Sequence, residues 1–286
     1  TGRCHSFDTR ADGYCRSDGV NVVIVEQNRP GYANIEGIGI NSDGFTKEGI
    51  TYPSGKAQGE LISQVFKENA SNIKPEDIKY HEAHGTGTIA GDREELNGLS
   101  SVYKTQKMYL GSVKSNMGHA EGASGLMGLI KILLMYEDRT IYPNFDFIDS
   151  PHEPIKRGQF QVLQKAKEWT PAPTSISNFG FGGTNAFCIL SPGECLNTVP
   201  VPKFENAKLN QCFSNYATED SPPENENYGG FYAIQRLLGN HEPFKYEYNA
   251  TTNKWKRSSP LVFVCDGQGS QWNGMGRELM KTSKVF

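Results

Sequence analysis

The sequence predicts a layered α/β fold, because segments with the periodicity of strands alternate with segments of helical periodicity. Short β-branched and apolar runs recur along the first 190 residues, and several of them lead directly into glycine-rich turns. Alternation of this kind is typical of helices packed in layers on a sheet. The runs predict strands at residues 20–25, 33–40, 80–83, 109–113, 174–178 and 184–190.

Helices are predicted between these strands. The first begins at Ser54 and presents an apolar face formed by residues 61, 62, 65 and 66. The second contains Asp92 and Glu95, whose spacing resembles a capping box, and carries apolar residues at 96, 99 and 102. The third, at residues 126–136, is apolar nearly all round, so we expect it to lie inside the domain.

Composition limits the classes of function. The formal net charge of the 286 residues is -3, and no concentrated basic face is visible, which argues against nucleic-acid binding. Because every apolar run is much shorter than the roughly 20 residues that span a bilayer, no membrane span is expected. The 6 cysteines contain no CxxC pair, as is typical of reduced thiols in a cytoplasmic protein.

The composition also predicts three regions. Residues 1–190 hold the α/β domain. Residues 191–259 are polar and interrupted by prolines, with one helix predicted at 232–238 and one strand at 243–248. Residues 260–286 open with an apolar strand at 261–265 that runs into the turn DGQGSQW. The chain starts without methionine and stops inside a helical pattern, so we expect it to be a fragment of a longer protein.

Two histidines and a lysine lie in glycine-rich turns. His84 belongs to EAHGTGT (82–88), whereas Lys114 and His119 belong to GSVKSNMGH (111–119). Glycines permit close approach of a substrate, and two neutral imidazoles can donate N–H groups to an oxygen that becomes negative during a reaction. His119 is expected at the N-terminus of the third helix, where the helix dipole disfavours imidazolium. For either histidine, the alternative is a satisfied core residue.

Both motifs resemble those of beta-ketoacyl synthases of the thiolase superfamily. A third stretch, NFGFGGTN (178–185), resembles the C-terminal glycine turn of that family. The stretches GRCHSFD (2–8), DGYCRS (12–17) and ELNG (95–98) are most similar to type I fatty acid synthases of animals, while polyketide synthases share most of the motifs. The resemblance implies the C-terminal half of a thiolase-like fold, a small α+β linker domain, and the first strand of an acyltransferase domain.

The resemblance also implies roles for the residues of the first two motifs. His84 and His119 would hold the carbonyl of a malonyl thioester and stabilise the enolate left when carbon dioxide departs. Lys114 would orient this group; the alternative for Lys114 is a surface salt bridge. Thr86 and Thr88 match threonines that hydrogen-bond the phosphopantetheine arm, and ordinary turn hydroxyls are the alternative.

Further roles are implied nearer the C-terminus. Phe181 matches a gating phenylalanine whose backbone N–H helps to bind a tetrahedral oxyanion, with a core phenylalanine as the alternative. Gln268 would contribute its backbone N–H to the oxyanion hole of the acyltransferase domain, and an ordinary strand-to-helix turn is its alternative. The sequence departs from the family at Phe187, where histidine is usual, and at Asp266, where proline is usual. At Phe187 we expect altered packing rather than lost chemistry.

The predicted function is that of a multifunctional fatty acid synthase performing decarboxylative condensation. None of the cysteines lies in a small-residue elbow suited to a nucleophile, so the chain alone is expected to be inactive. No cofactor is expected on the chain itself: substrates would arrive on the phosphopantetheine of acyl carrier protein, and NADPH would serve other domains. The implied partners are acyl carrier protein, the rest of the synthase and a second copy in a homodimer.

Three alternatives remain open. A polyketide synthase would use the same condensation with different downstream processing. A non-catalytic relative kept for binding or assembly would lack the cysteine nucleophile. A metal site built on His81, Glu82, His84 and His119 is the least favoured, because the spacing departs from H-E-x-x-H and no cysteine pair assists.

Overall fold

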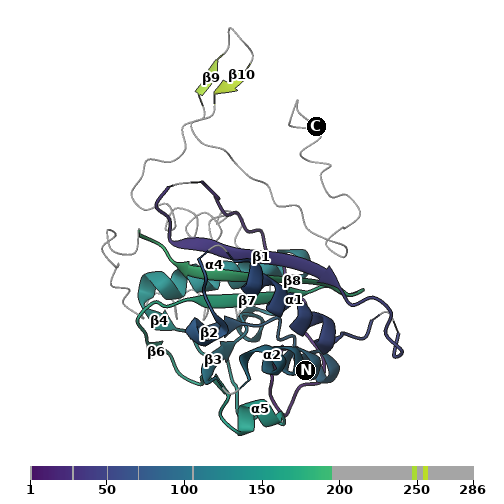
Figure 1. Cartoon of the computed structure of the whole chain (residues 1–286). Coiled ribbons are helices and arrows are strands. Elements are labelled where there is room, and N and C mark those ends of the chain that lie inside the picture. Colours follow the sequence, from purple (N-terminus) through teal and green to yellow (C-terminus); the bar gives the residue numbers. More distant parts are fainter. Residues whose placement is uncertain are drawn as a thin grey trace, which may run out of the picture. The chain divides into compact units, whose positions relative to one another are not determined.

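The computed structural model describes residues 2–194 apart from residues 28, 50, 70 and 105, together with the strands β9 (Glu247–Asn249) and β10 (Lys254–Lys256). Within residues 2–194 the chain builds a 6-stranded mixed sheet in the order β1-β8-β7-β2-β3-β5 (Figure 1). Its strands are β1 (Ala33–Ser42), β2 (Tyr80–Glu82), β3 (Met108–Gly111), β5 (Phe160–Val162), β7 (Thr174–Phe179) and β8 (Thr184–Pro192). The pairs of β8 are antiparallel, whereas β7, β2, β3 and β5 run parallel.

Helices cover both faces of this sheet (Figure 1). α1 (Gly55–Glu68) and α2 (Ile89–Tyr103) share one apolar core with strand residues such as Leu110 and Ile189. α4 (Ser124–Asp138) forms a second core with Tyr80, Ile176 and Leu190. Because alternate residues of a strand point to opposite faces, His81 faces α1 and α2 while Tyr80 and Glu82 face α4.

The remaining elements are short. They are α3 (Lys114–Met117), α5 (Glu153–Lys156), the 3-10 turns η1 (Pro75–Asp77) and η2 (Glu121–Ala123), and the two-stranded pair of β4 (Thr140–Ile141) with β6 (Lys167–Glu168). None of the helices in the described ranges combines the length and the apolar character that crossing a bilayer requires.

Most predicted strands and the first helix are confirmed. Ser54 caps α1, since its Oγ accepts the backbone N–H of Ala57 at 3.2 Å, and Leu61, Ile62 and Val65 are buried. The strand predicted at 20–25 is wrong: these residues form no strand, and Val20 is 93% exposed. β-branched composition favours a strand only where a neighbouring strand offers hydrogen bonds.

Two expectations about helix ends are also wrong. Thr88, not Asp92, caps α2, because the Thr88 hydroxyl accepts the N–H of Gly91 at 3.2 Å. His119 does not lie at the N-terminus of α4, since η2 separates it from Ser124. The helix α4 is buried along one face only, and Leu126, Leu129, Ile130, Leu133 and Leu134 are half-buried.

Beyond residue 194, the strand predicted at 243–248 overlaps β9, which pairs with β10 in an antiparallel ribbon. The predicted helix at 232–238, the strand at 261–265 and Gln268 lie outside the described residues. The predicted domain boundaries at 190/191 and 259/260 therefore stay predictions.

Close packing of α1 on α2 depends on glycine. A Cβ atom on Gly98 would lie 2.8 Å from the carbonyl oxygen of Gly55 and 3.3 Å from the nitrogen of Gly59, and both contacts are to backbone. We therefore expect Gly98→Ala to lower the free energy of unfolding in urea by about 1–3 kcal/mol. Gly31→Ala, whose Cβ would meet its nearest atom at 3.4 Å, is the control, and equal stability of the two variants would contradict the expectation.

Candidate active site

The structure brings His84 and His119 together at one edge of the sheet. Their ring centroids lie 5.4 Å apart at an interplanar angle of 84°. His84 follows β2, and His119 follows α3, which itself follows β3. Since β2 and β3 are parallel neighbours, the segments after them leave the sheet at the same edge, which is where α/β folds usually bind ligands.

The turn that carries His84 is held by a buried carboxylate. Glu95 on α2 accepts the backbone N–H groups of His84 and Gly85, each at 2.8 Å, through its two oxygens. Gly85 and Gly87 have φ angles of +41° and +79°, and a Cβ on Gly85 would lie 2.8 Å from the Cβ of Ser112. Glycine is therefore required here by both backbone conformation and close approach.

A second carboxylate on α2 anchors the N-terminal segment to the same turn. Asp92 accepts the N–H of Gly87 at 3.0 Å and the N–H of Phe7 at 2.6 Å, and burial raises the pKa of Asp92 to about 7. The sequence interpretation of Asp92 and Glu95 as a capping box is thus wrong. Asp92 binds the N–H of Gly87, directly before the cap residue Thr88, together with that of Phe7, and Glu95 binds the N–H groups of His84 and Gly85.

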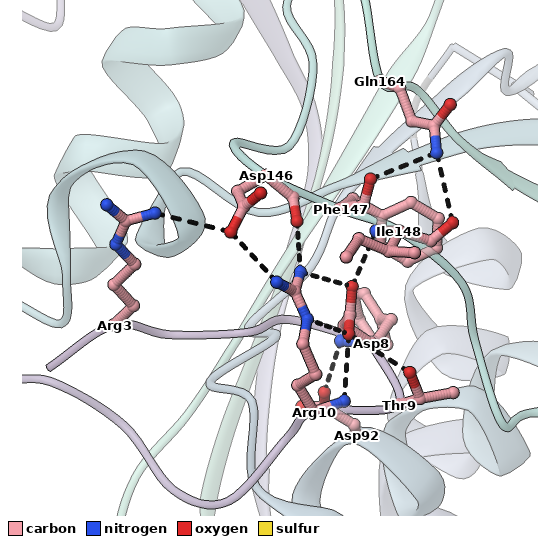
Figure 2. A network of polar contacts seen from close by, with 10 residues as sticks. Arg3, Asp8, Thr9, Arg10, Asp92, Asp146, Phe147, Ile148 and Gln164 are labelled. Atoms are coloured by element: carbon pink, nitrogen blue, oxygen red, sulfur yellow. Dashed lines mark hydrogen bonds and ion pairs between the residues drawn. The ribbon is translucent and has the colours of Figure 1, made fainter. Parts of the chain in front are cut away.

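The network in Figure 2 extends this anchoring to residues 3–10. Asp8 accepts the N–H of Ile148 at 2.8 Å and two guanidinium bonds from Arg10 at 2.9 Å and 3.0 Å. Burial raises the pKa of Asp8, but the hydrogen bonds from Arg10 outweigh it and leave the pKa well below its usual value. Asp146 binds Arg10 at 3.0 Å and also Arg3. The segment is therefore tied to the loop after β4.

The imidazole of His84 is neutral and has a defined tautomer. Its Nδ1 lies 2.7 Å from Oδ1 of Asn178, an oxygen that can only accept, so Nδ1 carries the proton. Burial, with the charges of Lys114 and His119, holds the pKa of His84 well below its usual value. A neutral ring protonated on Nδ1 has a lone pair on Nε2.

His119 has the opposite tautomer. Its Nδ1 accepts the backbone N–H of Glu121 at 2.9 Å, so the proton of the neutral ring is on Nε2. Glu121 adopts a φ of +50°, a left-handed conformation, at the start of η2. Burial lowers the pKa of His119 to about 4, aided by Lys114 and Arg16. The His119 backbone is fixed by its N–H bond to Cys15 at 2.7 Å.

These tautomers modify the expectation that both rings donate an N–H group to one oxygen. His119 presents a donor at Nε2, whereas neutral His84 presents an acceptor there because its proton is on Nδ1, which donates to Oδ1 of Asn178. The orientation of the Asn178 amide on β7, far from His84 in sequence, decides this difference, and no sequence pattern around His84 indicates it.

The tautomers predict a specific result in nuclear magnetic resonance. Between pH 7.5 and 5 the ¹⁵N shifts of His84 should show a proton on Nδ1 and those of His119 a proton on Nε2, with protonation of His119 only near pH 4. The urea-unfolded chain is the control, since its histidines should titrate near 6.5. Titration of His119 between pH 6 and 7 in the folded chain would contradict the assignment.

Lys114 lies inside the site. Its side chain is 2% exposed, which excludes the surface salt bridge considered as its alternative. Burial lowers the pKa of Lys114, while the charges of Glu82 and Glu95 act in the opposite direction. The preceding residue, Val113, donates its backbone N–H to Glu82 at 2.6 Å, and this bond fixes the start of α3.

Glu82 belongs to a buried ion pair that sequence reasoning missed. Its Oε2 lies 2.8 Å from Nζ of Lys131 on α4 and also accepts the hydroxyl of Tyr80. Lys131 bonds the Tyr80 hydroxyl at 2.8 Å. The available signal was a lysine inside the apolar third helix, because a cation at such a position requires a buried partner.

The remaining predicted site residues occupy different settings. Thr86 is buried, and its hydroxyl lies 3.1 Å from that of Thr88, which also caps α2. Phe181 is 86% exposed in the turn between β7 and β8, so the core alternative is excluded. Gln268 lies outside the described residues.

Cys4 and Cys188 do not have the character of activated thiols, and the described residues do not support the metal alternative. Burial raises the pKa of Cys4 and raises that of Cys188, on β8, to about 12, which is the opposite of an activated thiol. Within residues 2–194, no group of three or more His, Cys, Asp or Glu side chains is arranged to hold a metal ion. His81 instead uses both ring nitrogens on Ser175 and Ser177.

Comparison with known families agrees with this geometry. Residues 32–147 match the model described as "Beta-ketoacyl synthase, C-terminal domain", and residues 262–286 match "Acyl transferase domain". The fold and the matches thus define the C-terminal part of a ketosynthase domain with a thiolase-like α/β fold, followed by the start of an acyl transferase domain. Domains of these kinds make the chain part of a transferase-type enzyme.

The relatives narrow the class further. The chain is homologous to fungal polyketide synthases: it is 34% identical over 322 residues to highly reducing polyketide synthase AFT9-1 of Alternaria alternata, covering 98% of this chain and 11% of that protein. It is 42% identical over 205 residues to highly reducing polyketide synthase phiA of a fungal species, covering 66% and 8%. An animal-type fatty acid synthase is not specifically supported, and the comparisons favour the polyketide synthase alternative.

Solved structures show the same fold. Ketosynthase twelve of the bacillaene polyketide synthase of Bacillus amyloliquefaciens matches with a TM-score of 0.59 and 35% identity, over 67% of this chain and 37% of that one. The ketosynthase from module 6 of the bacillaene synthase of Bacillus subtilis matches with a TM-score of 0.58 and 33% identity, over 67% and 37%. The chain therefore spans about a third of these ketosynthase structures and a smaller share of the curated synthases.

Proposed function

We propose that this chain supplies the malonyl-binding half of a ketosynthase site in a polyketide synthase. In the proposed reaction the malonyl thioester loses carbon dioxide, the enolate carbon attacks an acyl thioester on a cysteine outside these residues, and the cysteine thiolate leaves. The observation that supports it most is the pair of neutral imidazoles of His84 and His119, 5.4 Å apart at one edge of the sheet.

In this proposal His119 is the donor. Its Nε2–H binds the thioester oxygen, and the bond strengthens as that oxygen becomes the enolate. Lys114 contributes a buried positive charge that favours an anionic intermediate, and it adds to the burial that keeps both imidazoles neutral. His84 presents the lone pair of Nε2 to the same space, where it accepts a hydrogen bond from a water or an N–H group of the substrate.

The other assignments stay proposals. Thr86 and Thr88 would bind the phosphopantetheine arm of an acyl carrier protein, Phe181 would act as the gate through its backbone N–H, and Gln268 would serve the acyltransferase oxyanion hole. The exposure of Phe181 is compatible with a mobile gate. The chain would act together with the rest of the synthase, whose other domains would bind NADPH. The synthase would be a homodimer in the cytoplasm. The chain alone would not condense substrates.

The experiment uses the full-length synthase that contains this segment. Incubation with malonyl-CoA and an acyl primer should release carbon dioxide and give an extended β-ketoacyl thioester, detected by mass spectrometry on the carrier domain. A reduced polyketide product supports the proposal, and a saturated fatty acid as sole product would instead support the fatty acid synthase reading. Absence of carbon dioxide release by a correctly folded synthase would overturn the proposed reaction.

A further inference from the structure

A file of buried polar side chains crosses the face of the sheet that α1 and α2 cover. Tyr103 OH lies 2.8 Å from Ser175 Oγ, which lies 2.7 Å from Nδ1 of His81. Nε2 of His81 lies 3.0 Å from Ser177 Oγ, which lies 2.6 Å from Oε1 of Glu95. All five residues are buried. His81 has no role in the proposed reaction, and the sequence suggested it only for the least favoured alternative, a metal site.

The direction of every hydrogen bond in this file is fixed by chemistry. Glu95 accepts two backbone N–H groups and the hydroxyl of Ser177, which donates to Oε1. Ser177 has then used its only proton, so His81 donates to Ser177 from Nε2. His81 consequently accepts at Nδ1 from Ser175, and Tyr103 donates to Ser175. Hydrogen bonds aligned in one direction polarise one another.

The file ends on the carboxylate that holds the His84 turn. Oε1 of Glu95 receives both the Ser177 hydroxyl and the His84 backbone N–H, and Oε2 receives the Gly85 N–H. The position of Glu95 therefore depends on Ser177, and the position of Ser177 depends on His81.

Burial of an imidazole at position 81 costs free energy, because the ring is polar and loses its contact with water. The ring stacks on Phe187 at a centroid distance of 6.1 Å and lies 6.4 Å from the ring of Tyr103, so its faces meet apolar surface. Burial lowers the pKa of His81 to about 3, and the ring stays neutral. At Phe187, where we expect altered packing, the stacked neighbour is the imidazole of His81. That imidazole belongs to β2, whereas the histidine that is usual at position 187 would belong to β8.

We propose that His81 is a positioning residue that acts through Ser177 and Glu95 to hold the His84 turn in its catalytic geometry. This inference rests on the proposed function. It predicts that breaking the file impairs malonyl decarboxylation specifically, because a displaced turn misplaces His84, while the acyl-loading cysteine lies elsewhere. A merely structural role would lower stability and affect both partial reactions alike.

The test compares variants of the full-length synthase. His81→Leu removes both hydrogen bonds of the ring, and Ser177→Ala removes the link to Glu95. His81→Gln retains a donor and an acceptor. Tyr136→Phe is the matched control, because it removes a buried hydroxyl that lies 2.8 Å from the hydroxyl of Thr174. Thr174 belongs to β7, as Ser175 and Ser177 do, but faces the opposite side of the sheet. Each variant is assayed for carbon dioxide release from malonyl thioester and for acyl loading of the cysteine.

We expect His81→Leu and Ser177→Ala to lower kcat for decarboxylation by about ten- to hundredfold with acyl loading retained. The double variant should be no worse than either single variant, because both interrupt the same file. His81→Gln should recover most of the rate, and Tyr136→Phe should match wild type. If His81→Leu does not fold, as shown by lost acyl loading, Ser177→Ala and His81→Gln decide the matter.

A pH profile adds a readout that packing alone would not move. The titratable or charged groups that face Glu95 are Lys114 from α3, His81 from β2 and Asp92 on α2. Burial raises the pKa of Glu95 and the Ser177 hydrogen bond partly offsets this, so loss of that bond raises the pKa further. The carboxylate is needed in its charged form, and the acid limb of decarboxylation in Ser177→Ala should therefore lie at higher pH than in wild type.

The outcomes separate the two proposals. A wild-type synthase that loads acyl groups but releases no carbon dioxide overturns the proposed function. An active wild type in which His81→Leu or Ser177→Ala behaves like Tyr136→Phe, with an unshifted acid limb, overturns only the positioning role of His81. A double variant whose loss equals the product of the two single losses also overturns it.

Discussion

Replacing His119 by alanine in the full-length synthase should lower malonyl decarboxylation by about 10²- to 10³-fold. In the proposed reaction the His119 Nε2–H is the donor whose hydrogen bond strengthens as the thioester oxygen turns into an enolate, and alanine offers no substitute. Acyl transfer to the cysteine should persist, because that step does not form the malonyl enolate. Carbon dioxide release and acyl loading, measured separately, give the comparison.

Two further variants make the His119 result specific. His119→Gln keeps an N–H donor and should retain more activity than His119→Ala. His152→Ala removes a half-buried histidine at the start of α5, outside the site, and should behave like wild type. Undiminished decarboxylation in His119→Ala would remove the assigned role.

Replacing Lys131 by methionine should have the largest effect on stability. The substitution leaves the carboxylate of Glu82 buried without the ammonium that now lies 2.8 Å away. Removing one member of a buried ion pair typically lowers the free energy of unfolding by about 3–5 kcal/mol. Because Glu82 also holds the N–H of Val113, decarboxylation by the folded fraction should fall as well.

The matching control removes both charges. Glu82→Gln combined with Lys131→Met leaves no unpaired charge, so its loss of stability in urea should be well below that of Lys131→Met alone. Lys56→Met removes an exposed lysine that lies 3.8 Å from Glu60, and should change stability by no more than about 0.5 kcal/mol. A Lys131→Met variant as stable as Lys56→Met would show that the pair contributes nothing.

The sequence predicts correctly those elements that are stabilised by interactions between residues close together in the chain. The helix α1 has a serine cap and an apolar stripe, and both signals are contained in its own residues. Residues 20–25 are rich in β-branched side chains, and yet they form no strand. A strand also needs hydrogen bonds from a partner strand elsewhere in the chain. The sequence carries no local record of that partner.

The candidate site divides in the same way. Glycine-rich turns indicated His84, Lys114 and His119, and the structure brings the two rings together. The tautomer of His84 depends on Asn178, a tertiary contact, and that of His119 depends on the local backbone conformation at Glu121, and spacing of the motifs encodes neither. Asp92 and Glu95 have the spacing of a capping box, but their carboxylates accept hydrogen bonds from backbone N–H groups of the turn that follows β2.

The distinction between synthase classes has a similar cause. Fatty acid and polyketide synthases share the condensation step, so the residues that perform it carry the same motifs in both. The relatives, rather than the motifs, favoured the polyketide synthases.

The most direct test of the central claim is a crystal structure of the full-length ketosynthase region with a malonyl thioester analogue that does not decarboxylate. We predict the thioester oxygen at about 2.7–3.2 Å from Nε2 of His119. A thioester oxygen bound away from His119, with its Nε2 facing a different cavity, would contradict the account.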